Sequence, residues 1–478
     1  MQEIQVYNTL TKRKEVFQPI EDGKVSIYVC GVTPYNHPHI GNARPFVTWD
    51  VIHRFLEYCG YEVRHIQNFT DVDDKIIQAA RLAERSWDEI AEENIAAYFT
   101  AMDALHVRRT DNYPRVSEHI GEIIAMIEGL LAKGHAYTLH GDVYYDISTF
   151  AAYGELSGRT VEDMLAGARV EVDGEKRNPG DFALWKAAKP EEPAWESPWG
   201  QGRPGWHIEC SAMSTKYLGD TFDFHGGGSD LIFPHHENEI AQSEGCTGRH
   251  FVNYWVHNGF ITINQEKMSK SLDNFFLVKD ILAHYSADAL RFFLISTHYR
   301  SPLDFSDERL EEAERTLERI DGAIRKARFR LDGAAAVRNE AAQAMQAAAE
   351  AAKAEFIAAM SDDFNTAMAL GVLFTLVRRL NTYLAEEAVA DRTALETVLR
   401  VLRDMTEILG ILPQSWTEGN AADAHAYREL MDVILAVRQE ARTQKQYAVA
   451  DAIRDRLQAI GITLEDGPEG TVWTKSEV

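Results

Sequence analysis

The spacing of apolar residues in the first part of the chain changes repeatedly between that of a strand and that of a helix. Residues 25–30 (VSIYVC) form a short apolar run rich in β-forming residues, and a loop with glycine and two prolines follows. Apolar positions recur at helical spacing over 42–59, and residues 61–69 are again typical of a strand. The next helix is expected to begin with Thr70 or Asp71 as its cap. This alternation predicts an α/β fold with a doubly wound, Rossmann-like parallel sheet, whose ligands bind at the carboxyl ends of the strands.

A less regular stretch interrupts this pattern. Residues 142–148 and 168–172 are short strand-like pieces among many Gly, Pro and Trp residues, which predicts an insertion over about 110–205. Strand patterns resume at 221–230 (TFDFHGGGSD) and at 254–264 (YWVHNGFITIN). The sheet domain with its insertion is therefore expected to continue to about residue 304.

The second half of the chain has helical periodicity with almost no strand signal. Four helices are predicted at 306–331, 338–360, 364–386 and 391–411. After a linker (PQSWTEGN), two helices are predicted near 423–443 and 446–460, with a hairpin at 462–473. The predicted domains are an α/β domain over 1–304, an all-α bundle over 305–412 and a small mixed C-terminal module over 420–478.

Composition narrows the class of protein. The chain has 478 residues, with 49 basic and 74 acidic side chains and a net charge of −25. This charge argues against nonspecific nucleic-acid binding, but it does not exclude a specific complex built on local basic patches. Four cysteines in so long a chain exclude a disulfide scaffold. No apolar run approaches the roughly 20 residues that span a bilayer, and the first residues lack the pattern of a signal peptide. A cytoplasmic protein without membrane contact is expected.

Two segments carry candidate phosphate chemistry. The loop 31–44 places His37, His39 and Gly41 between a strand and a helix N-terminus, where backbone N–H groups favour phosphate. The alternative interpretation of this loop is a Pro/Gly turn with exposed histidines. The segment 266–274 (EKMSKSLDN) carries two lysines that suit a leaving polyphosphate, and its alternative is a solvated basic loop.

Two cysteines, a histidine and a glutamate form a plausible zinc set of borderline-soft ligands. Residues 234–239 (PHHENE) are expected to open a helix with Pro234 in its first turn, which places His235 and Glu239 on one face. Cys30 ends the first strand, and Cys210 lies in WHIECS. Buried structural thiols are the alternative, since these cysteines lie far apart in the sequence. His236 is an alternative ligand to its neighbour.

Several motifs resemble those of one enzyme family. HIGN (39–42) and KMSKS (267–271) resemble the HIGH and KMSKS motifs of class I aminoacyl-tRNA synthetases. Longer stretches resemble the cysteinyl-tRNA synthetases along essentially the whole chain, namely YVCGVTPYNHPHIGNAR, NFTDVDDKII, GRPGWHIECSAMS, HGGGSDLIFPHHENEIAQSE and KMSKSLDN. The chain departs from the usual pattern in having Asn42 in place of the second histidine and GVTPY (31–35) in place of GPTVY.

The resemblance implies ATP-dependent ligation of L-cysteine to tRNA(Cys) through a cysteinyl-adenylate, with Mg²⁺ on the ATP and one Zn²⁺ per chain. The implied zinc ligands are Cys30, Cys210, His235 and Glu239. The implied catalytic residues are His39, Asn42, Lys267 and Lys270. The nucleotide would contact Gly41, Gly228, Asp230, Ser269 and Lys270. The amino acid would contact Gly31, Thr70 and Trp206. The aspartates of residues 71–74 are expected to be a solvated helix start rather than a second metal site.

The resemblance also implies that the bundle and the C-terminal module bind tRNA and that the protein acts as a monomer. Basic residues gather at 319–330 and at 438–456, and the alternative for both is a solvated helix face. Trp473 either stacks on an anticodon base or closes the hairpin core. Two other functions stay open: a cysteine ligase of the mycothiol pathway, which the GVTPY variant resembles, and a catalytically silent tRNA-binding paralogue.

Overall fold

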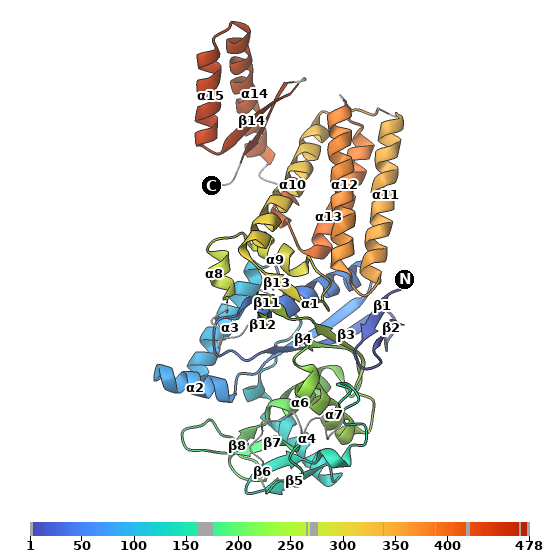
Figure 1. The fold of residues 1–478 in the computed structure, drawn as a ribbon, viewed down its shortest axis with the longest axis vertical. Coiled ribbons are helices and arrows are strands. Elements are labelled where there is room, and N and C mark those ends of the chain that lie inside the picture. Colours follow the sequence, from blue (N-terminus) through green and yellow to red (C-terminus); the bar gives the residue numbers. More distant parts are fainter. Residues whose placement is uncertain are drawn as a thin grey trace.

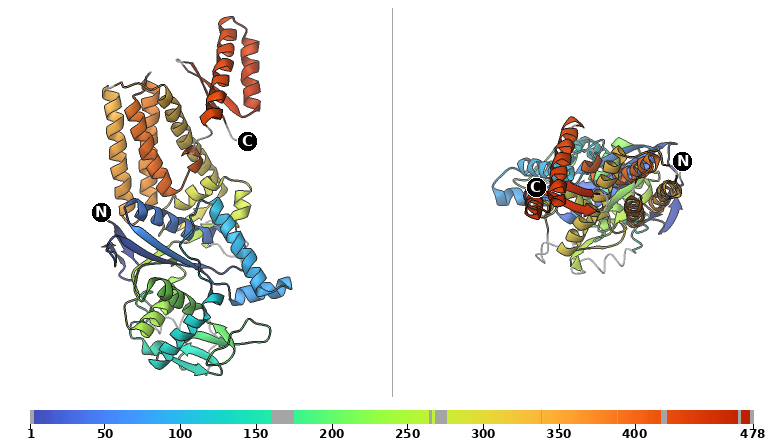
Figure 2. Two further views of the ribbon diagram at one scale, coloured as in Figure 1. Left: turned by 180° about the vertical axis from the view of Figure 1, so that it is seen from behind. Right: turned by 90° about the horizontal axis from the view of Figure 1, so that it is seen from above.

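The protein is elongated, with a parallel sheet near its middle, a helical bundle on one side of the sheet and an inserted domain on the other (Figure 1). The C-terminal module lies at the end of the bundle remote from the sheet, and Figure 2 shows the same order from behind. The computed structural model describes residues 3–159, 175–263, 266–267, 276–337, 339–387, 389–416, 421–467 and 470–475.

The central sheet has four parallel strands in the order β10-β9-β3-β4. Its members are β3 (Lys24–Val32), β4 (Glu62–Phe69), β9 (Phe222–Gly228) and β10 (Val252–Asn258). Helix α1 (Ile40–Tyr58) leads from β3 to β4 on one side, whereas the chain later returns to β9 on the other side of β3. The carboxyl ends of β3 and β9 therefore flank a topological switch point, the usual ligand position on such a sheet. The predicted doubly wound sheet is confirmed.

Side chains of β3 alternate between two hydrophobic cores, as the period of two in a strand requires. Ile27 and Val29 belong to the core that α1 and the bundle share. Tyr28 and Cys30 belong to a second core with the inserted domain and the helices that follow it. The alternation thus directs Cys30 toward helices that come nearly two hundred residues later in the chain.

The inserted domain consists of helices and an antiparallel sheet of order β5-β6-β7-β8. The helices that precede and follow the sheet are α2 (Asp74–Ala83), α3 (Trp87–Ala104), α4 (Ile120–Ala132), α6 (Trp206–Leu218) and α7 (Glu237–Thr247). The strands are β5 (Ala136–Leu139), β6 (Asp142–Tyr145), β7 (Phe182–Ala187) and β8 (Gly202–Pro204). Strand β6 confirms the piece predicted at 142–148, while the piece at 168–172 lies outside the described residues.

The cap expected for α2 is wrong. Asp73 is the N-cap, and its side chain accepts a hydrogen bond from the backbone N–H of Lys75. Asp71 is instead buried, with 3% of its surface exposed, and its carboxylate accepts bonds from the backbone and side chain of Ser117. The expectation of a solvated helix start therefore fails for Asp71, because this carboxylate ties the end of β4 to the inserted domain.

A second, smaller sheet of order β12-β11-β13 follows the central one. This region contains β11 (Ile261–Ile263), β12 (Glu266–Lys267), α8 (Val278–Leu282), α9 (Ala287–Ile295) and β13 (Leu303–Phe305). An N-terminal hairpin of β1 (Gln5–Asn8) and β2 (Arg13–Val16) lies against β10. Short 3-10 turns occur at Val116–Glu118, Ile147–Thr149 and Pro413–Trp416.

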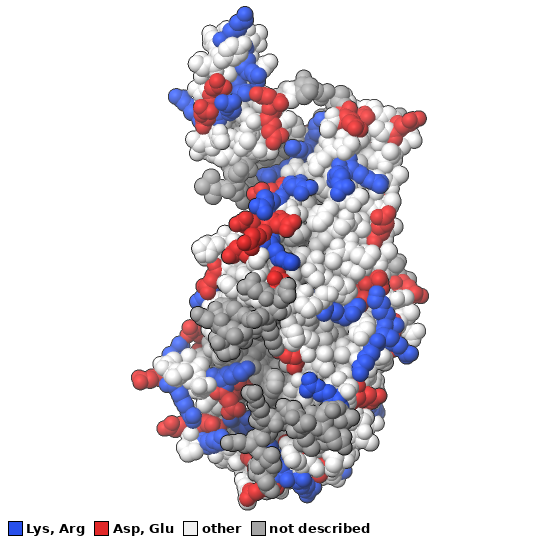
Figure 3. All heavy atoms as spheres, viewed as in Figure 1, with Lys and Arg blue, Asp and Glu red and all other residues white. Residues whose placement is uncertain are grey.

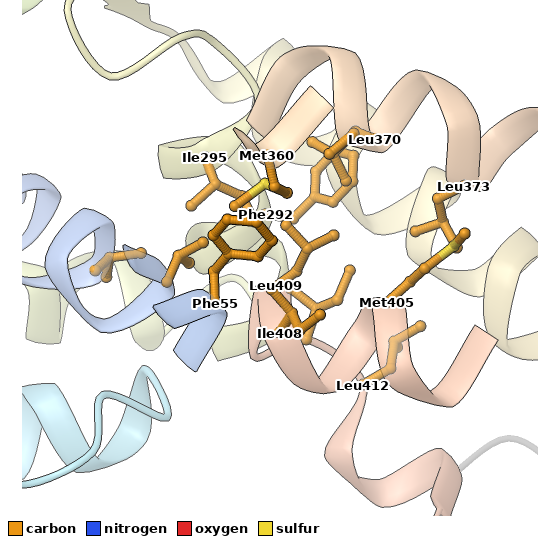
Figure 4. Close-up of a cluster of buried hydrophobic side chains, with 14 of the residues drawn as sticks. Phe55, Phe292, Ile295, Met360, Leu370, Leu373, Met405, Ile408, Leu409 and Leu412 are labelled. Atoms are coloured by element: carbon orange, nitrogen blue, oxygen red, sulfur yellow. The ribbon is translucent and has the colours of Figure 1, made fainter. Parts of the chain in front are cut away.

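The four helices predicted for the bundle are confirmed. They are α10 (Asp307–Asp332), α11 (Glu340–Ser361), α12 (Thr366–Glu386) and α13 (Arg392–Leu409). Phe55 of α1 and Phe292 of α9 pack against Met360, Leu370 and Leu409 of the bundle (Figure 4). The sheet domain and the bundle thus share one continuous core.

The C-terminal module has a small core of its own. It contains α14 (Ala421–Thr443), α15 (Tyr447–Ala459), β14 (Ile462–Gly467) and β15 (Gly470–Lys475), which confirm the predicted helices and hairpin. Met431, Leu457 and Ile462 are buried together, and Trp473 packs against them. Among the described residues, no helix has the length and apolar character needed to cross a membrane.

Candidate active site and metal centre

The N-terminus of α1 lies directly after the carboxyl end of β3. His39 is the N-cap: its Nδ1 accepts a hydrogen bond from the backbone N–H of Asn42 at 3.2 Å, and Asn42 Oδ1 accepts one from the N–H of His39 at 3.4 Å. This reciprocal pair is a capping box, so Asn42 has a local structural reason to be an asparagine. Because Nδ1 acts as an acceptor, neutral His39 carries its proton on Nε2.

Gly31 lies where β3 and β4 approach too closely for a side chain. The register of the two strands shifts between Val29 and Val32, and a Cβ on Gly31 would lie 1.5 Å from the carbonyl oxygen of Asn68. The N–H of Gly31 donates to Asn68 Oδ1 at 2.9 Å. Asn68 Nδ2 in turn donates to Thr70 Oγ1 at 3.4 Å. Two of the predicted amino-acid contacts, Gly31 and Thr70, are therefore joined through a residue that the sequence did not single out.

The two distant cysteines meet in the second core. Cys30 Sγ and Cys210 Sγ are 3.7 Å apart, both side chains are buried, and neither forms a disulfide. Two thiolates on one tetrahedral zinc, with Zn–S bonds of about 2.3 Å, would be about 3.8 Å apart. The sulfur separation therefore fits a shared zinc ion.

His235 and Glu239 complete this cluster. His235 Nε2 is 3.0 Å from Glu239 Oε1, which is 3.5 Å from Cys30 Sγ. One donor atom from each of Cys30, Cys210, His235 and Glu239 lies within 4.8 Å of the others. The helical start expected at Pro234 is confirmed: in the turn Ile232–His236 only Phe233 has non-helical backbone angles, and the turn continues without a break into α7, which begins at Glu237.

Outer hydrogen bonds orient these ligands. His225 Nε2 donates to Glu239 Oε2 at 2.8 Å, which leaves Oε1 facing the sulfurs. His207 Nδ1 lies 3.0 Å from His235 Nδ1, so Nε2 of His235 is the nitrogen that faces the cluster. Such outer partners typically accompany metal-ligating histidines and carboxylates. Neither His207 nor His225 was predicted, because outer partners follow from tertiary packing and have no signal of their own in the sequence.

A second combination of donors overlaps the first. Cys30, His225, His236 and Glu239 also lie within 4.8 Å of one another. In this set His225 Nε2 already bonds Glu239 Oε2, while His236 Nε2 lies 3.3 Å from Cys30 Sγ and its Nδ1 bonds His257 Nε2 at 2.7 Å. The set with two cysteines leaves one carboxylate oxygen and one imidazole nitrogen directed at two sulfurs, which is the better match to zinc.

Charge is strongly coupled within the cluster. The hydrogen bond from Cys30 lowers the pKa of the Cys210 thiol to about 6, whereas burial raises the pKa of Cys30. Burial also opposes ionisation of Glu239, but the neighbouring charges of His225 and His235 outweigh it and lower the pKa of Glu239 to about 2. The cluster therefore favours an anionic Cys210 sulfur and an anionic Glu239 carboxylate, the forms that bind a divalent metal.

Trp206 forms the solvent side of this region. Its ring stacks on His235 with centroids 4.4 Å apart and an interplanar angle of 28°, and 39% of its surface is exposed. Cys210 Sγ is 3.7 Å from Asn68 Oδ1, which connects the thiols to Gly31 and Thr70. The predicted amino-acid contacts and the predicted metal ligands are thus parts of one site at the carboxyl ends of β3 and β4.

The remaining predicted residues lie around this site or beyond the described structure. Gly41 is in the first turn of α1, and Gly228 ends β9 next to β3. Asp230 is exposed, and a Cβ on Gly228 would lie 2.4 Å from its Oδ1. Lys267 ends β12, whose backbone pairs with β11. Ser269 and Lys270 lie outside the described residues.

The predicted basic patches are partly engaged in folding contacts. Arg438 is buried and forms a bidentate pair with Asp466, and Arg442 bonds the same carboxylate. Arg328 and Arg330 donate to backbone carbonyls of the bundle and of the turn after it. On the face in Figure 3, basic side chains of the bundle and module lie beside acidic ones rather than forming a continuous basic surface.

Three family models match successive parts of the chain. The class I (C) catalytic domain of tRNA synthetases matches residues 16–315, a DALR domain matches 355–413, and a cysteinyl-tRNA ligase anticodon binding domain matches 424–473. The first of these alone spans more than half of the chain.

Curated relatives and solved structures agree with these matches. A cysteine--tRNA ligase of Pelotomaculum thermopropionicum is 54% identical over 99% of this chain and 100% of its own length. A cysteine--tRNA ligase of Thermococcus onnurineus is 48% identical over 99% of this chain and 100% of its own length. A Mycobacterium tuberculosis methionyl-tRNA synthetase in complex with methionyl-adenylate has the same fold, with a TM-score of 0.62 and 17% identity over 82% of this chain and 91% of that one. The chain therefore belongs to the cysteinyl-tRNA synthetase family of class I aminoacyl-tRNA synthetases.

Proposed function

We propose that this protein ligates L-cysteine to tRNA(Cys) with ATP, through a cysteinyl-adenylate. The observation that carries the proposal is the position of the thiol cluster. Four metal-ligating side chains lie at the carboxyl ends of the strands, in the same switch region as the phosphate-favouring N-terminus of α1. The relatives named above, which match the chain from end to end, carry the name of this activity.

In the first step, the cysteine carboxylate attacks the α-phosphate of ATP and releases pyrophosphate. The positive end of the α1 dipole and the imidazole of His39 stabilise charge on the phosphate. Lys267 and Lys270, with Mg²⁺ on the phosphates, neutralise the departing pyrophosphate. In the second step, a ribose hydroxyl at the tRNA terminus attacks the carbonyl carbon of the adenylate, which forms the cysteinyl ester, breaks the acyl–phosphate bond and releases AMP. Positioning and electrostatics suffice, and no side chain acts as a covalent nucleophile.

Cys30, Cys210, His235 and Glu239 would hold one Zn²⁺. A zinc ion there would bind the thiolate of cysteine and disfavour the hydroxyl of serine, which a pocket selecting by shape discriminates poorly. Trp206, which stacks on His235, would flank the bound amino acid. Gly31 and Thr70, which Asn68 links to the sulfur of Cys210, would contact the amino acid, and Gly41, Gly228, Asp230 and Ser269 would contact the nucleotide.

The proposal assigns the first step to residues 1–304 and tRNA recognition to the bundle (305–412) and the module (420–478). This division separates the synthetase from its two rivals. A mycothiol-pathway ligase has a small amine acceptor, for which an anticodon-binding module has no use, and a silent tRNA-binding paralogue needs no intact thiol cluster.

Two assays test the proposal with the full-length protein. Cysteine-dependent exchange of pyrophosphate into ATP measures the first step, and charging of a tRNA(Cys) transcript measures both, with serine as the control amino acid. Exchange and charging with cysteine alone are expected. Exchange without charging would favour the small-amine ligase, and the absence of both would favour the silent paralogue.

A further inference from the structure

Arg44 occupies an unusual position for a charged side chain. It lies in α1, two residues after Asn42, and only 1% of its surface is exposed. Among the described residues, no acidic side chain forms an ion pair with it, and its Nε has no hydrogen-bond partner. Burial lowers the pKa of Arg44 to about 10, so the guanidinium stays charged at neutral pH.

The partners of Arg44 are three backbone carbonyls from two separate segments. Nη1 donates to the carbonyls of Gly259 at 2.8 Å and Phe260 at 3.1 Å, and Nη2 donates to that of His298 at 3.2 Å. The first two residues lead directly into β11, and the third lies in the segment between α9 and β13. Arg44 therefore joins α1 to both segments that form the second sheet.

That sheet carries the first lysine of the KMSKS motif. Thr262 of β11 pairs with Lys267 of β12, so the backbone of Lys267 takes its position from β11. The segments that precede β11 and β13 lie close together. The N–H of Gly259 donates to the carbonyl of Tyr299 at 2.8 Å, and a Cβ on Gly259 would lie 2.5 Å from the carbonyl oxygen of Ser301. A shift of β11 relative to α1 would move Lys267 relative to the phosphate-favouring helix N-terminus.

A second attachment to α1 lies beyond the motif. The N–H of Ile40 donates to the carbonyl of Phe276, and the N–H of Val278 donates to that of Pro38, both at 3.0 Å. The described residues after the motif are thus bonded to α1 by backbone, whereas those before it are bonded by side chains: Arg44, and Thr48, whose Oγ1 accepts a hydrogen bond from Asn258 Nδ2 at 3.0 Å. Of these two, only Arg44 bonds both segments of the second sheet, and it can be removed by substitution.

We propose that Arg44 is a positioning residue for adenylate formation, which holds the strand pair bearing Lys267 at a fixed place relative to His39 and the N-terminus of α1. The inference rests on the proposed function. A planar guanidinium can bridge carbonyls from two segments, whereas an ammonium is a single donor point. An apolar side chain of similar length would fill the same space with less desolvation, so the guanidinium is explained by the geometry that it imposes.

The test compares three full-length variants. Arg44→Met removes the charge and every donor, and Arg44→Lys keeps the charge. Arg54→Met is the control on the same helix, since Arg54 lies toward the other end of α1 and bonds Asp50 and the carbonyls of His106 and Glu407 rather than the second sheet. Each variant is measured for thermal midpoint, bound zinc, KM for cysteine and kcat of pyrophosphate exchange.

Arg44→Met is expected to lower the exchange kcat by about 100-fold, the usual cost of misplacing a catalytic group by an ångström. Bound zinc and the KM for cysteine should stay at wild-type values, because the thiol cluster lies on the opposite face of β3. Arg44→Lys should recover part of the loss. Arg54→Met should lower the thermal midpoint yet keep the exchange kcat within about threefold of wild type.

Three results overturn the inference: an Arg44→Met kcat within about threefold of wild type, a loss confined to the KM for cysteine, or losses in both methionine variants that follow their thermal midpoints. If Arg44→Met does not fold, the exchange kcat of Arg44→Lys tests the inference instead. A wild-type kcat in Arg44→Lys would exclude a positioning role for Arg44. A wild-type protein without exchange would instead refute the proposed function itself.

Discussion

Asp50 of α1 and Arg291 of α9 form a buried ion pair, with Oδ2 and Nη2 2.5 Å apart and side chains 2% and 0% exposed. Arg291 also donates to the carbonyls of Leu105 and of Leu409, the last residue of α13. One guanidinium thus joins the helix that begins at His39 to the helical bundle. It does so beside the apolar cluster of Figure 4, where α1, α9 and α13 meet.

Removing one partner of this pair should destabilise the protein strongly. Arg291→Met leaves the Asp50 carboxylate buried without one of its charge partners, which typically costs about 3–5 kcal/mol. Urea unfolding followed by circular dichroism measures the loss. The control is Arg13→Met, which removes an exposed pair with Glu15 and should change the unfolding free energy by less than about 1 kcal/mol. Equal effects of the two substitutions would contradict the prediction.

The acid side of the stability profile should depend on His65. This side chain on β4 is buried, and burial lowers its pKa to about 3 from an ordinary value of 6.5. Below pH 6.5 the unfolded chain binds a proton that the folded protein does not. Stability should therefore fall with decreasing pH, by up to about 1.4 kcal/mol per unit for this group, until about pH 3.

His65→Gln tests this dependence, since it removes the titrating group at the same buried position. Unfolding free energies of the variant and the wild type should converge as the pH falls from 6.5 toward 4. A constant difference across that range would show that His65 titrates alike in both states. His53→Gln serves as the control, because His53 lies beside His65 but is less deeply buried, and the charge of Glu57 opposes the lowering of its pKa by burial.

Cys210→Ser should weaken metal binding, while the sheet should keep its fold. The substitution replaces a thiolate by a hydroxyl, a poor zinc ligand, while Cys30, His235 and Glu239 stay in place. Bound zinc should fall from one to well below one per chain, and the affinity for cysteine and the rejection of serine should both decline. Cys246→Ser is the matched control, since Cys246 lies outside the cluster. Wild-type zinc content and selectivity in Cys210→Ser would refute the zinc hypothesis.

Elements with a clear local period could be predicted from the sequence. The helix expected at 391–411 is α13 (Arg392–Leu409), and the strand expected at 61–69 is β4 (Glu62–Phe69). In both, the buried face repeats within a few residues, so no distant contact is needed to recognise it. The cap of α2 could not be predicted in this way, because Asp71 and Asp73 are equivalent as local caps. The contact of Asp71 with Ser117, 46 residues away, decides between them.

The residues of the candidate site also differ in whether their role could be predicted from local sequence. Cys30 and His235 could be proposed as ligands from residue type and motif, but the distance between them depends on which face of β3 Cys30 occupies and on where the turn Ile232–His236 packs. His207 and His225 act only as outer partners, and nothing in their local sequence distinguishes them from ordinary core histidines. For Trp473 the sequence allowed two roles, an anticodon contact and a place in the hairpin core. In the structure this side chain packs against the module's own core.

Removing the C-terminal module should separate the two steps of the reaction. The cut should follow Trp416, because Ser415 Oγ donates to Asp321 at 2.6 Å and Trp416 Nε1 donates to Thr406 at 2.8 Å, so both residues belong to the bundle. The module beyond has its own core, and its Glu465 meets Lys326 of α10 across 3.6 Å. Loss of residues 417–478 should therefore leave pyrophosphate exchange within about threefold of the full chain.

Charging should respond differently, since the tRNA would lose one of two linked contact regions. Its kcat/KM for tRNA(Cys) should fall by about 100-fold or more, a typical contribution of a second tethered binding site. A chain ending at Leu412 is the matched control: it lacks Ser415 and Trp416 as well, and its thermal midpoint should drop below that of the chain ending at Trp416. Parallel losses of exchange and charging in the Trp416 truncation, without a drop in its thermal midpoint, would mean that the module acts on the adenylation site rather than on tRNA alone.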